Sequence, residues 1–318
     1  MLPPKNRMTI RQPETFFHQT QSVEDFEKDS SGLMPRDGSG SDRKNRLAKS
    51  TVAGLAVALA MVPEAVAFSF VAGVNPLTGL WTTVLLGFTA ALLGGRAGIC
   101  SSASGACSVV VAALSRSHGP SYLAATAILA GLFQMTGGIL NLGRFVRLVP
   151  HPVMLGFVNG LALVMTKAQL AHFKGLSLAT KMGASTYGIT ALTMVLVKLL
   201  PKITKAVPPT LGAVILATIA SRVFGLPVST LSDVAGASTF VGGWQVLPKF
   251  GLPRIPFTLE TLGVITPYAL TMAAVGAIES LLTMQLVDNM MDDGKKGSTK
   301  REVFGQGAGN LVSGLFGG

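Results

Sequence analysis

Apolar residues recur in long runs along most of the chain, and short polar connections separate these runs. Each run is long enough to enter a membrane as a helix. Nine such segments lie at about residues 48–72, 76–94, 101–115, 121–143, 151–173, 184–200, 207–226, 259–288 and 302–318. Residues 227–257 contain turn formers and prolines, which predicts an outer loop. Residues 1–47 are polar and mixed in charge, which predicts a disordered cytoplasmic tail ahead of a transmembrane domain over 48–318.

The composition supports a membrane protein. The 318 residues are 49% hydrophobic and 13% charged, with a mean hydropathy of +0.51. Soluble domains carry about a quarter charged residues, so we expect an integral membrane protein in a lipid bilayer. The net charge of +11 does not indicate a nucleic-acid partner, because the basic residues form short clusters between apolar segments.

These basic clusters predict the orientation. They precede the first segment and lie between the fourth and fifth, the sixth and seventh, and the eighth and ninth segments. All of them fall on the same side of the membrane if the N-terminus is cytoplasmic, as the positive-inside rule requires. We therefore expect a multi-pass protein with a cytoplasmic N-terminus, in the plasma membrane. Lys167 falls inside the fifth segment and either snorkels outward, which is favoured, or helps to attract an anion.

The third segment is predicted to be a broken span. Glycines and serines precede its helical part: Gly94, Gly95, Gly98, Ser101, Ser102 and Ser104. A helix over 101–115 would be about 22 Å long, against about 30 Å of hydrocarbon. We therefore expect an extended lead-in and a helix that starts inside the bilayer, where its free N–H groups favour an anion. The alternative is a small-residue packing helix whose serines bond to their own carbonyls.

Two acids lie near the middle of apolar segments, Glu64 in the first and Glu279 in the eighth. A charge at the bilayer centre costs from about 3 to above 10 kcal/mol, so each acid is protonated, paired or bound to a cation. Thr283 lies one turn after Glu279, and this pair suits Na⁺ or a proton relay. The alternative is a neutral Glu279 bonded between helices. Phe68, one turn after Glu64, either lines the same cavity or packs in the core or against lipid.

Other polar groups complete the pattern. Asp288 ends the eighth segment and is expected in a solvated turn. Gln306 and Asn310 are expected to form hydrogen bonds across a close helix contact, because glycines surround them. The sequence contains no Walker motif, no Gly-x-Ser-x-Gly motif and no metal-ligand spacing of histidines. The chain is therefore not expected to be an enzyme. No cofactor is expected beyond a coupling Na⁺ or H⁺.

An internal repeat is also indicated. The first and eighth segments each carry an acid, and the segment after each ends in a double glycine, Gly94-Gly95 and Gly317-Gly318. Units offset by seven spans sit upside down to each other in the membrane, which predicts an inverted repeat. The second broken helix would begin after Gly318, so the chain is expected to hold the first repeat and the start of the second.

Several motifs resemble the SulP family of anion transporters, the sulfate permeases. They are Val62-Pro-Glu-Ala-Val-Ala-Phe-Ser-Phe, Pro150-His-Pro-Val-Met-Leu-Gly-Phe, Glu279-Ser-Leu-Leu-Thr and Arg301-Glu-Val-Phe-Gly-Gln-Gly-Ala-Gly-Asn. The resemblance covers residues 48–318. It implies an all-α membrane fold of seven plus seven inverted spans and a homodimer when full length. It also implies a cytoplasmic STAS domain after the last span. The tenth to fourteenth spans and the STAS domain are not in this sequence.

The resemblance also implies roles for individual residues. The family binds its anion between the start of the third and tenth spans, which assigns substrate binding to Glu64, Phe68, Ser102 and Ser104. Glu279 and Thr283 fall on an acid and a hydroxyl that hold Na⁺ in the bicarbonate-transporting branch. Two departures stand out. Glu64 replaces a common Gln, and Ala103 replaces a common proline.

We therefore expect secondary active transport of a small inorganic oxyanion, sulfate or bicarbonate first and a dicarboxylate next. Alternating access would be coupled to H⁺ or Na⁺ through Glu279. One alternative is a nucleobase permease of the same architecture, although the Gly-Gln-Gly-x-Gly-Asn stretch and the hydroxyl-rich third helix favour the anion transporter. The other is a truncated fragment that does not transport.

Overall fold

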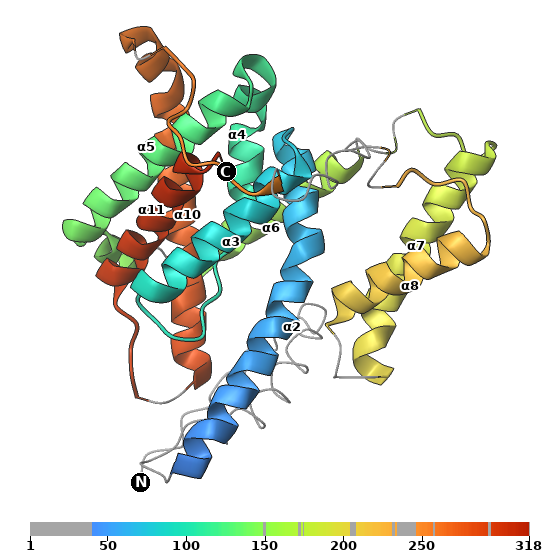
Figure 1. Cartoon of the computed structure of the whole chain (residues 1–318), viewed down its shortest axis with the longest axis horizontal. Helices are drawn as coiled ribbons and strands as arrows, with labels where there is room; N and C mark the ends of the chain where they lie inside the picture. Colours follow the sequence, from blue (N-terminus) through green and yellow to red (C-terminus); the bar gives the residue numbers. More distant parts are fainter. Residues whose placement is uncertain are drawn as a thin grey trace, which may run out of the picture.

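The computed structural model describes residues 40–317, except 149–150, 171–172, 174, 204–207, 231–232, 234–245, 257 and 292–293. Over this part of the chain, all regular structure is helical (Figure 1). In chain order the helices are α2 (Gly40–Ala72), α3 (Pro76–Leu93), α4 (Gly105–His118), α5 (Pro120–Ile139), the 3-10 helix η2 (Leu142–Leu148), α6 (His151–Leu170), α7 (Lys181–Ile203), α8 (Pro209–Val223), α10 (Leu259–Met291) and α11 (Thr299–Leu315). Every apolar segment predicted from the sequence corresponds to one α-helix.

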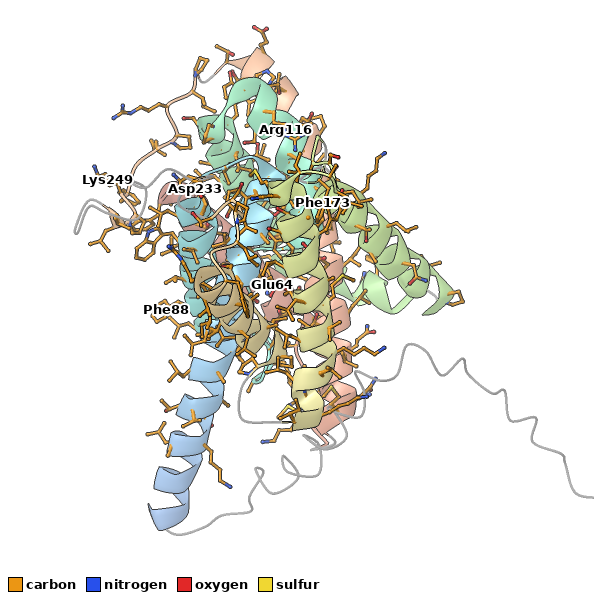
Figure 2. All side chains as sticks on the ribbon, turned by 90° about the vertical axis from the view of Figure 1, so that its right-hand side faces the viewer. Glu64, Phe88, Arg116, Phe173, Asp233 and Lys249 are labelled. Atoms are coloured by element: carbon orange, nitrogen blue, oxygen red, sulfur yellow. The ribbon has the colours of Figure 1, made fainter. Side chains whose placement is uncertain are left out.

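Five of these helices are long and apolar enough to cross a membrane: Leu47–Ala72 within α2, and α3, α5, α7 and α10. The apolar helix α8 is shorter, at 15 residues. Large apolar side chains stay exposed on the outside, among them Phe88 at 68% and Met194 at 71%. Figure 2 shows Phe88 at the edge of the bundle, pointing outward. Exposed apolar surface of this kind suits contact with lipid.

The first helix begins earlier than the sequence pattern predicted. Helix α2 begins at Gly40, so residues 40–47, assigned to the polar tail, are helical. Most of these residues are polar, but no proline or further glycine interrupts them before Gly54, so nothing in the sequence ends the helix here. The remainder of the predicted tail, residues 1–39, lies outside the described residues. So do residues 231–232, 234–245 and 257 of the predicted outer loop. In its described part, the backbone carbonyl of Val246 accepts a hydrogen bond from the indole of Trp81.

The helices form two groups with α2 between them. Helices α3, α4, α5, α10 and α11 make up a bundle in which α11 packs against both α5 and α3. Helices α7 and α8 pack on each other on the other side of α2 (Figure 1). Helix α2 contacts α3 and α4 of the bundle, and also α8. The bundle therefore holds the broken span α4 between α2 and α10.

Close backbone contact joins α5 to α11. A Cβ added at Gly131 would lie 2.6 Å from the carbonyl oxygen of Gly307, and a Cβ at Gly307 would lie 2.6 Å from the backbone nitrogen of Met135. Both glycines are buried. Small residues let two helices approach this closely inside a membrane, where packing rather than hydrophobic burial holds helices together. The glycine-rich α11 therefore sits at the centre of the bundle.

Candidate functional site

The break in the third span is the feature that positions the site. Helix α3 ends at Leu93, and α4 does not begin until Gly105. The backbone between them is not helical, and Gly98 has a φ of +93°, a conformation that favours glycine. The expected interruption is confirmed. The expected start of the helix at Ser101 was wrong by four residues.

Tertiary hydrogen bonds explain the late start of α4. The backbone N–H of Ala103 donates to the Thr83 hydroxyl on α3 at 3.3 Å, and Ser101 accepts a bond from the Gln306 side chain on α11. These partners hold the lead-in in an extended form that helix propensity alone does not predict. Ser104 then acts as the N-cap, with its hydroxyl oxygen accepting from the N–H of Cys107 at 3.4 Å.

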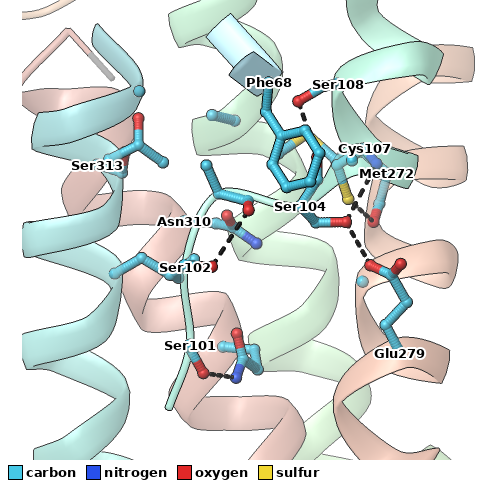
Figure 3. A pocket seen from close by; sticks show the side chains of 18 of the residues that line it. Phe68, Ser101, Ser102, Ser104, Cys107, Ser108, Met272, Glu279, Asn310 and Ser313 are labelled. Carbon is cyan, nitrogen blue, oxygen red and sulfur yellow. Dashed lines mark hydrogen bonds between the residues drawn. The ribbon is translucent and has the colours of Figure 1, made fainter. Parts of the chain in front are cut away.

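The first turn of α4 opens into a cavity of about 540 Å³ that six helices surround. One water molecule takes up about 30 Å³ in the liquid, so the cavity can hold a small hydrated ion. The six residues predicted for substrate and ion binding all line it: Glu64, Phe68, Ser102, Ser104, Glu279 and Thr283. Figure 3 shows Phe68 and Ser104 on one side of the extended lead-in and Glu279 below Ser104. The structure thus brings together residues from α2, from the lead-in before α4 and from α10.

Ser104 and Glu279 are in direct contact. The Ser104 hydroxyl donates to Oε2 of Glu279, and the two oxygens are 2.5 Å apart. The hydroxyl of Thr283 donates instead to the backbone carbonyl of Glu279 at 2.9 Å, so its oxygen still has a lone pair for another ligand. The contact joins the start of the broken helix to the acid on α10.

The charge of the cavity is unusual for an anion site. Among the described residues that line it there are two acids, Glu64 and Glu279, and no Lys, Arg or His. Glu64 keeps an exposed side chain at the cavity wall, whereas Glu279 is half-buried. Two unit charges 4 Å apart repel by about 4 kcal/mol at an effective dielectric constant of 20, which corresponds to about a thousandfold in affinity. An anion held 4 Å from an ionised carboxylate of this cavity would therefore be strongly disfavoured.

Lys167 does not offset the negative charge of the cavity. Its side chain is exposed on α6, and it is not among the residues that line the cavity. This placement favours the snorkelling interpretation over a role in attracting the anion.

Asp288 was misjudged from the sequence. Its carboxylate lies 2.9 Å from Nε of Arg96, and the two side chains are only 16% and 7% exposed. The carboxylate also accepts the backbone N–H of Gly297 just before α11. The expected solvated turn was therefore wrong. The proximity of Arg96 to Asp288 depends on the lead-in folding back onto the end of α10, and no local sequence pattern signals that contact.

A second group of polar residues was partly predicted. The Asn310 side-chain amide donates to Gln134 on α5 at 2.7 Å, which confirms the expected hydrogen bond across a close helix contact. Gln134 in turn donates to the backbone carbonyl of Ala273 on α10 at 3.1 Å. Sequence reasoning missed Gln134, although a glutamine within an apolar helix is the kind of signal that marks a buried partner. It also missed Glu302, a carboxylate that is only 2% exposed.

The transmembrane part of the chain, from residue 47 onward, matches one protein family. The model of the sulfate permease family matches residues 47–196 and 182–318. The chain therefore belongs to the sulfate permease family, a family of membrane anion transporters, and the expected resemblance is confirmed.

Named relatives agree with this class. The chain is 41% identical over 271 residues to the putative sulfate transporter YbaR of Bacillus subtilis, a match that covers 85% of this chain and 54% of that protein. It is 31% identical over 290 residues to the bicarbonate transporter BicA of a Picosynechococcus species, over 83% of this chain and 50% of that protein. The chain thus spans about half the length of these relatives.

Two solved structures share the fold. The transmembrane domain of a cyanobacterial bicarbonate transporter BicA matches with a TM-score of 0.66 at 29% identity, over 84% of this chain and 72% of that one. Murine Slc26a9, an anion transporter in the inward-facing state, matches with a TM-score of 0.65 over 98% of this chain and 55% of that one. Because the second match has only 15% identity, it supports a shared fold and nothing further. The chain is an integral membrane protein with the architecture of these transporters, and its regular structure is helical wherever the structure describes it.

Proposed function

We propose that this chain forms one side of the anion site in a secondary active transporter of a small oxyanion. Sulfate or bicarbonate is the first choice, and a dicarboxylate is next. The observation that carries the proposal is the start of α4, which opens into a cavity of about 540 Å³ with Ser104 bonded to Glu279. The transporters named among its relatives carry sulfate or bicarbonate, which supports this substrate class.

The backbone of α4 supplies the binding groups for the anion. The N–H groups of Gly105 and Ala106 have no carbonyl partner within the helix, because the first turn of any α-helix leaves its N–H groups unpaired. The helix dipole adds a partial positive charge at the same point, and together these favour an anion. Ser102, Ser104 and Phe68 then surround the ion at the cavity wall.

The acids of the cavity supply the coupling. An anion beside an ionised Glu279 is repelled, so binding requires that the carboxylate carry a proton or hold a cation. A Na⁺ ion takes oxygen ligands, and the Glu279 carboxylate with the Thr283 and Ser104 hydroxyls offers such a set on α10 and α4. A proton would sit on the same carboxylate. Either way, the anion and the coupling ion enter together, and the loaded cavity changes sides by alternating access.

We place the complete protein in the plasma membrane with a cytoplasmic N-terminus, as a homodimer. The basic clusters between the apolar segments support this orientation.

The proposal is tested by uptake of labelled sulfate and bicarbonate into proteoliposomes that contain the complete gene product. The Ser104→Phe variant should abolish uptake, because the ring fills the space at the start of α4. The Glu279→Gln variant should remove the dependence on an H⁺ or Na⁺ gradient, because an amide neither ionises nor binds Na⁺ strongly. The matched control is Ser117→Phe, at the exposed end of the same helix. Uptake that is indifferent to both site variants, or uptake of labelled uracil in place of anions, would contradict the proposal.

A further inference from the structure

A chain of hydrogen bonds runs from the first turn of α11 to the wall of the cavity. Glu302 accepts the backbone N–H of Gly95 on Oε2 at 2.9 Å and the side-chain amide of Gln306 on Oε1 at 3.1 Å. The same nitrogen of Gln306 also donates to the hydroxyl oxygen of Ser101. Ser101 lines the cavity, and Figure 3 shows it bonded to this amide at the lower end of the lead-in.

The donor and acceptor capacities of these groups fix the direction of every bond in the chain. Both carboxylate oxygens of Glu302 accept a hydrogen bond, one from the backbone N–H of Gly95 and one from the side-chain amide of Gln306. The Gln306 amide must therefore turn its nitrogen, and not its oxygen, toward Glu302. Both hydrogens of that nitrogen are then used, one on Glu302 and one on Ser101.

The consequence falls on the Ser101 hydroxyl. A serine hydroxyl has one hydrogen to donate and two lone pairs with which to accept. Gln306 occupies a lone pair, so the hydrogen of Ser101 is left for another acceptor. Among the described residues, none accepts a hydrogen bond from it. Ser101 is half-buried and lines the cavity, so a molecule held in the cavity can accept this hydrogen.

We propose that Ser101 is a further ligand of the transported oxyanion, which accepts its O–H, and that Glu302 and Gln306 are positioning residues that fix this direction. The inference rests on the proposed function, because the acceptor is the anion of that site. An isolated serine serves a cation or an anion equally well. Here Glu302 and Gln306 keep the hydrogen of Ser101 free, so this part of the wall can donate a hydrogen bond to an anion.

The positioning is tested by a double-mutant cycle on anion affinity. The dissociation constants of sulfate and bicarbonate are measured by titration calorimetry on the complete gene product in detergent. Ser101→Ala should weaken binding about 10- to 100-fold, the usual range for a hydrogen bond to a charged group. Glu302→Gln keeps the shape but can donate to Gln306, whose amide can then turn its oxygen to Ser101. The hydroxyl hydrogen turns away from the cavity, and binding should weaken to a similar extent.

The decisive quantity is the coupling between the two changes. Once Ser101→Ala is present, adding Glu302→Gln should weaken binding no further, since both act through one hydrogen. The matched controls are Ser117→Ala and Glu260→Gln, an exposed serine and an exposed acid on helices of the same bundle. Each control should bind the anion as the unaltered protein does. If Glu302→Gln does not fold, Gln306→Met takes its place in the cycle, with a smaller effect that also vanishes in Ser101→Ala.

The outcomes separate this inference from the proposed function. Additive losses would overturn the positioning role, because Glu302 would then act through the fold and not through Ser101. An unchanged dissociation constant in Ser101→Ala would overturn the ligand role alone. If the unaltered protein binds neither anion, this inference and the proposed function both fail.

Discussion

Replacing Gly307 by alanine is expected to force α11 away from α5 and to destabilise the bundle. A Cβ at this position would lie 2.6 Å from the backbone nitrogen of Met135 and 2.7 Å from the carbonyl oxygen of Gly131, well short of the 3.4 Å at which ordinary contact begins. Backbone atoms cannot rotate away as a side chain can. Overpacking of this kind costs about 1–3 kcal/mol.

Two further terms adjust this magnitude. Separation of the helices also strains the hydrogen bond from Asn310 to Gln134, worth about 1 kcal/mol. Alanine recovers a similar amount through its better helix propensity. The net loss of stability is therefore about 1–3 kcal/mol. For domains of 150–250 residues each kcal/mol lowers the melting temperature by about 2–4 °C.

The assay is thermal unfolding of the purified protein in detergent, followed by circular dichroism at one fixed scan rate. The matched control is Gly263→Ala on α10, where an added Cβ meets nothing within 4 Å. That variant should melt at the same temperature as the unaltered protein or slightly above it. Equal melting temperatures for the two variants would refute the close α5–α11 contact.

Two more changes test the polar groups around the cavity. Glu64→Gln removes one of the two acids of the cavity, so the anion's Michaelis constant at neutral pH should fall and its dependence on pH should weaken. Uptake measured from pH 5 to 8 checks this. An unchanged pH profile would show that Glu64 does not face the anion. Gln134→Leu removes the acceptor of the Asn310 amide and the side-chain bond to the Ala273 carbonyl, so stability should fall by about 1–3 kcal/mol. A melting curve checks this, and an unchanged melting temperature would contradict the contribution of these bonds.

The helices could be predicted from the sequence because the bilayer imposes a simple rule on it. Each span must be apolar over its length, so the segments from 76–94 to 302–318 are visible as runs of apolar residues. Helix ends were less predictable. The start of α2 at Gly40 depends on polar residues that carry no apolar signal, and the start of α4 depends on Thr83 and Gln306, far away in the sequence.

The candidate site was predicted as far as its residues carry a local signal. Glu64 and Glu279 stand out because acids are rare inside apolar segments, and Ser104 stands out as an N-cap. Glu302 carries no such signal, because an acid beside Lys300 and Arg301 at the start of a helix resembles an ordinary solvated turn. Only the packing of α11 against the lead-in buries it, and in that contact Gly305 of α11 meets Gly94, the residue just after the end of α3.

The most direct test of the anion site is a structure of the complete gene product determined with bound selenate, an analogue of sulfate, and separately with bicarbonate. Density for at least one of these anions is expected in the cavity, within hydrogen-bond distance of the Gly105 or Ala106 N–H groups and of the Ser104 hydroxyl. An anion bound only elsewhere, with this cavity empty at saturating concentrations of both, would contradict a binding site at the start of the broken helix.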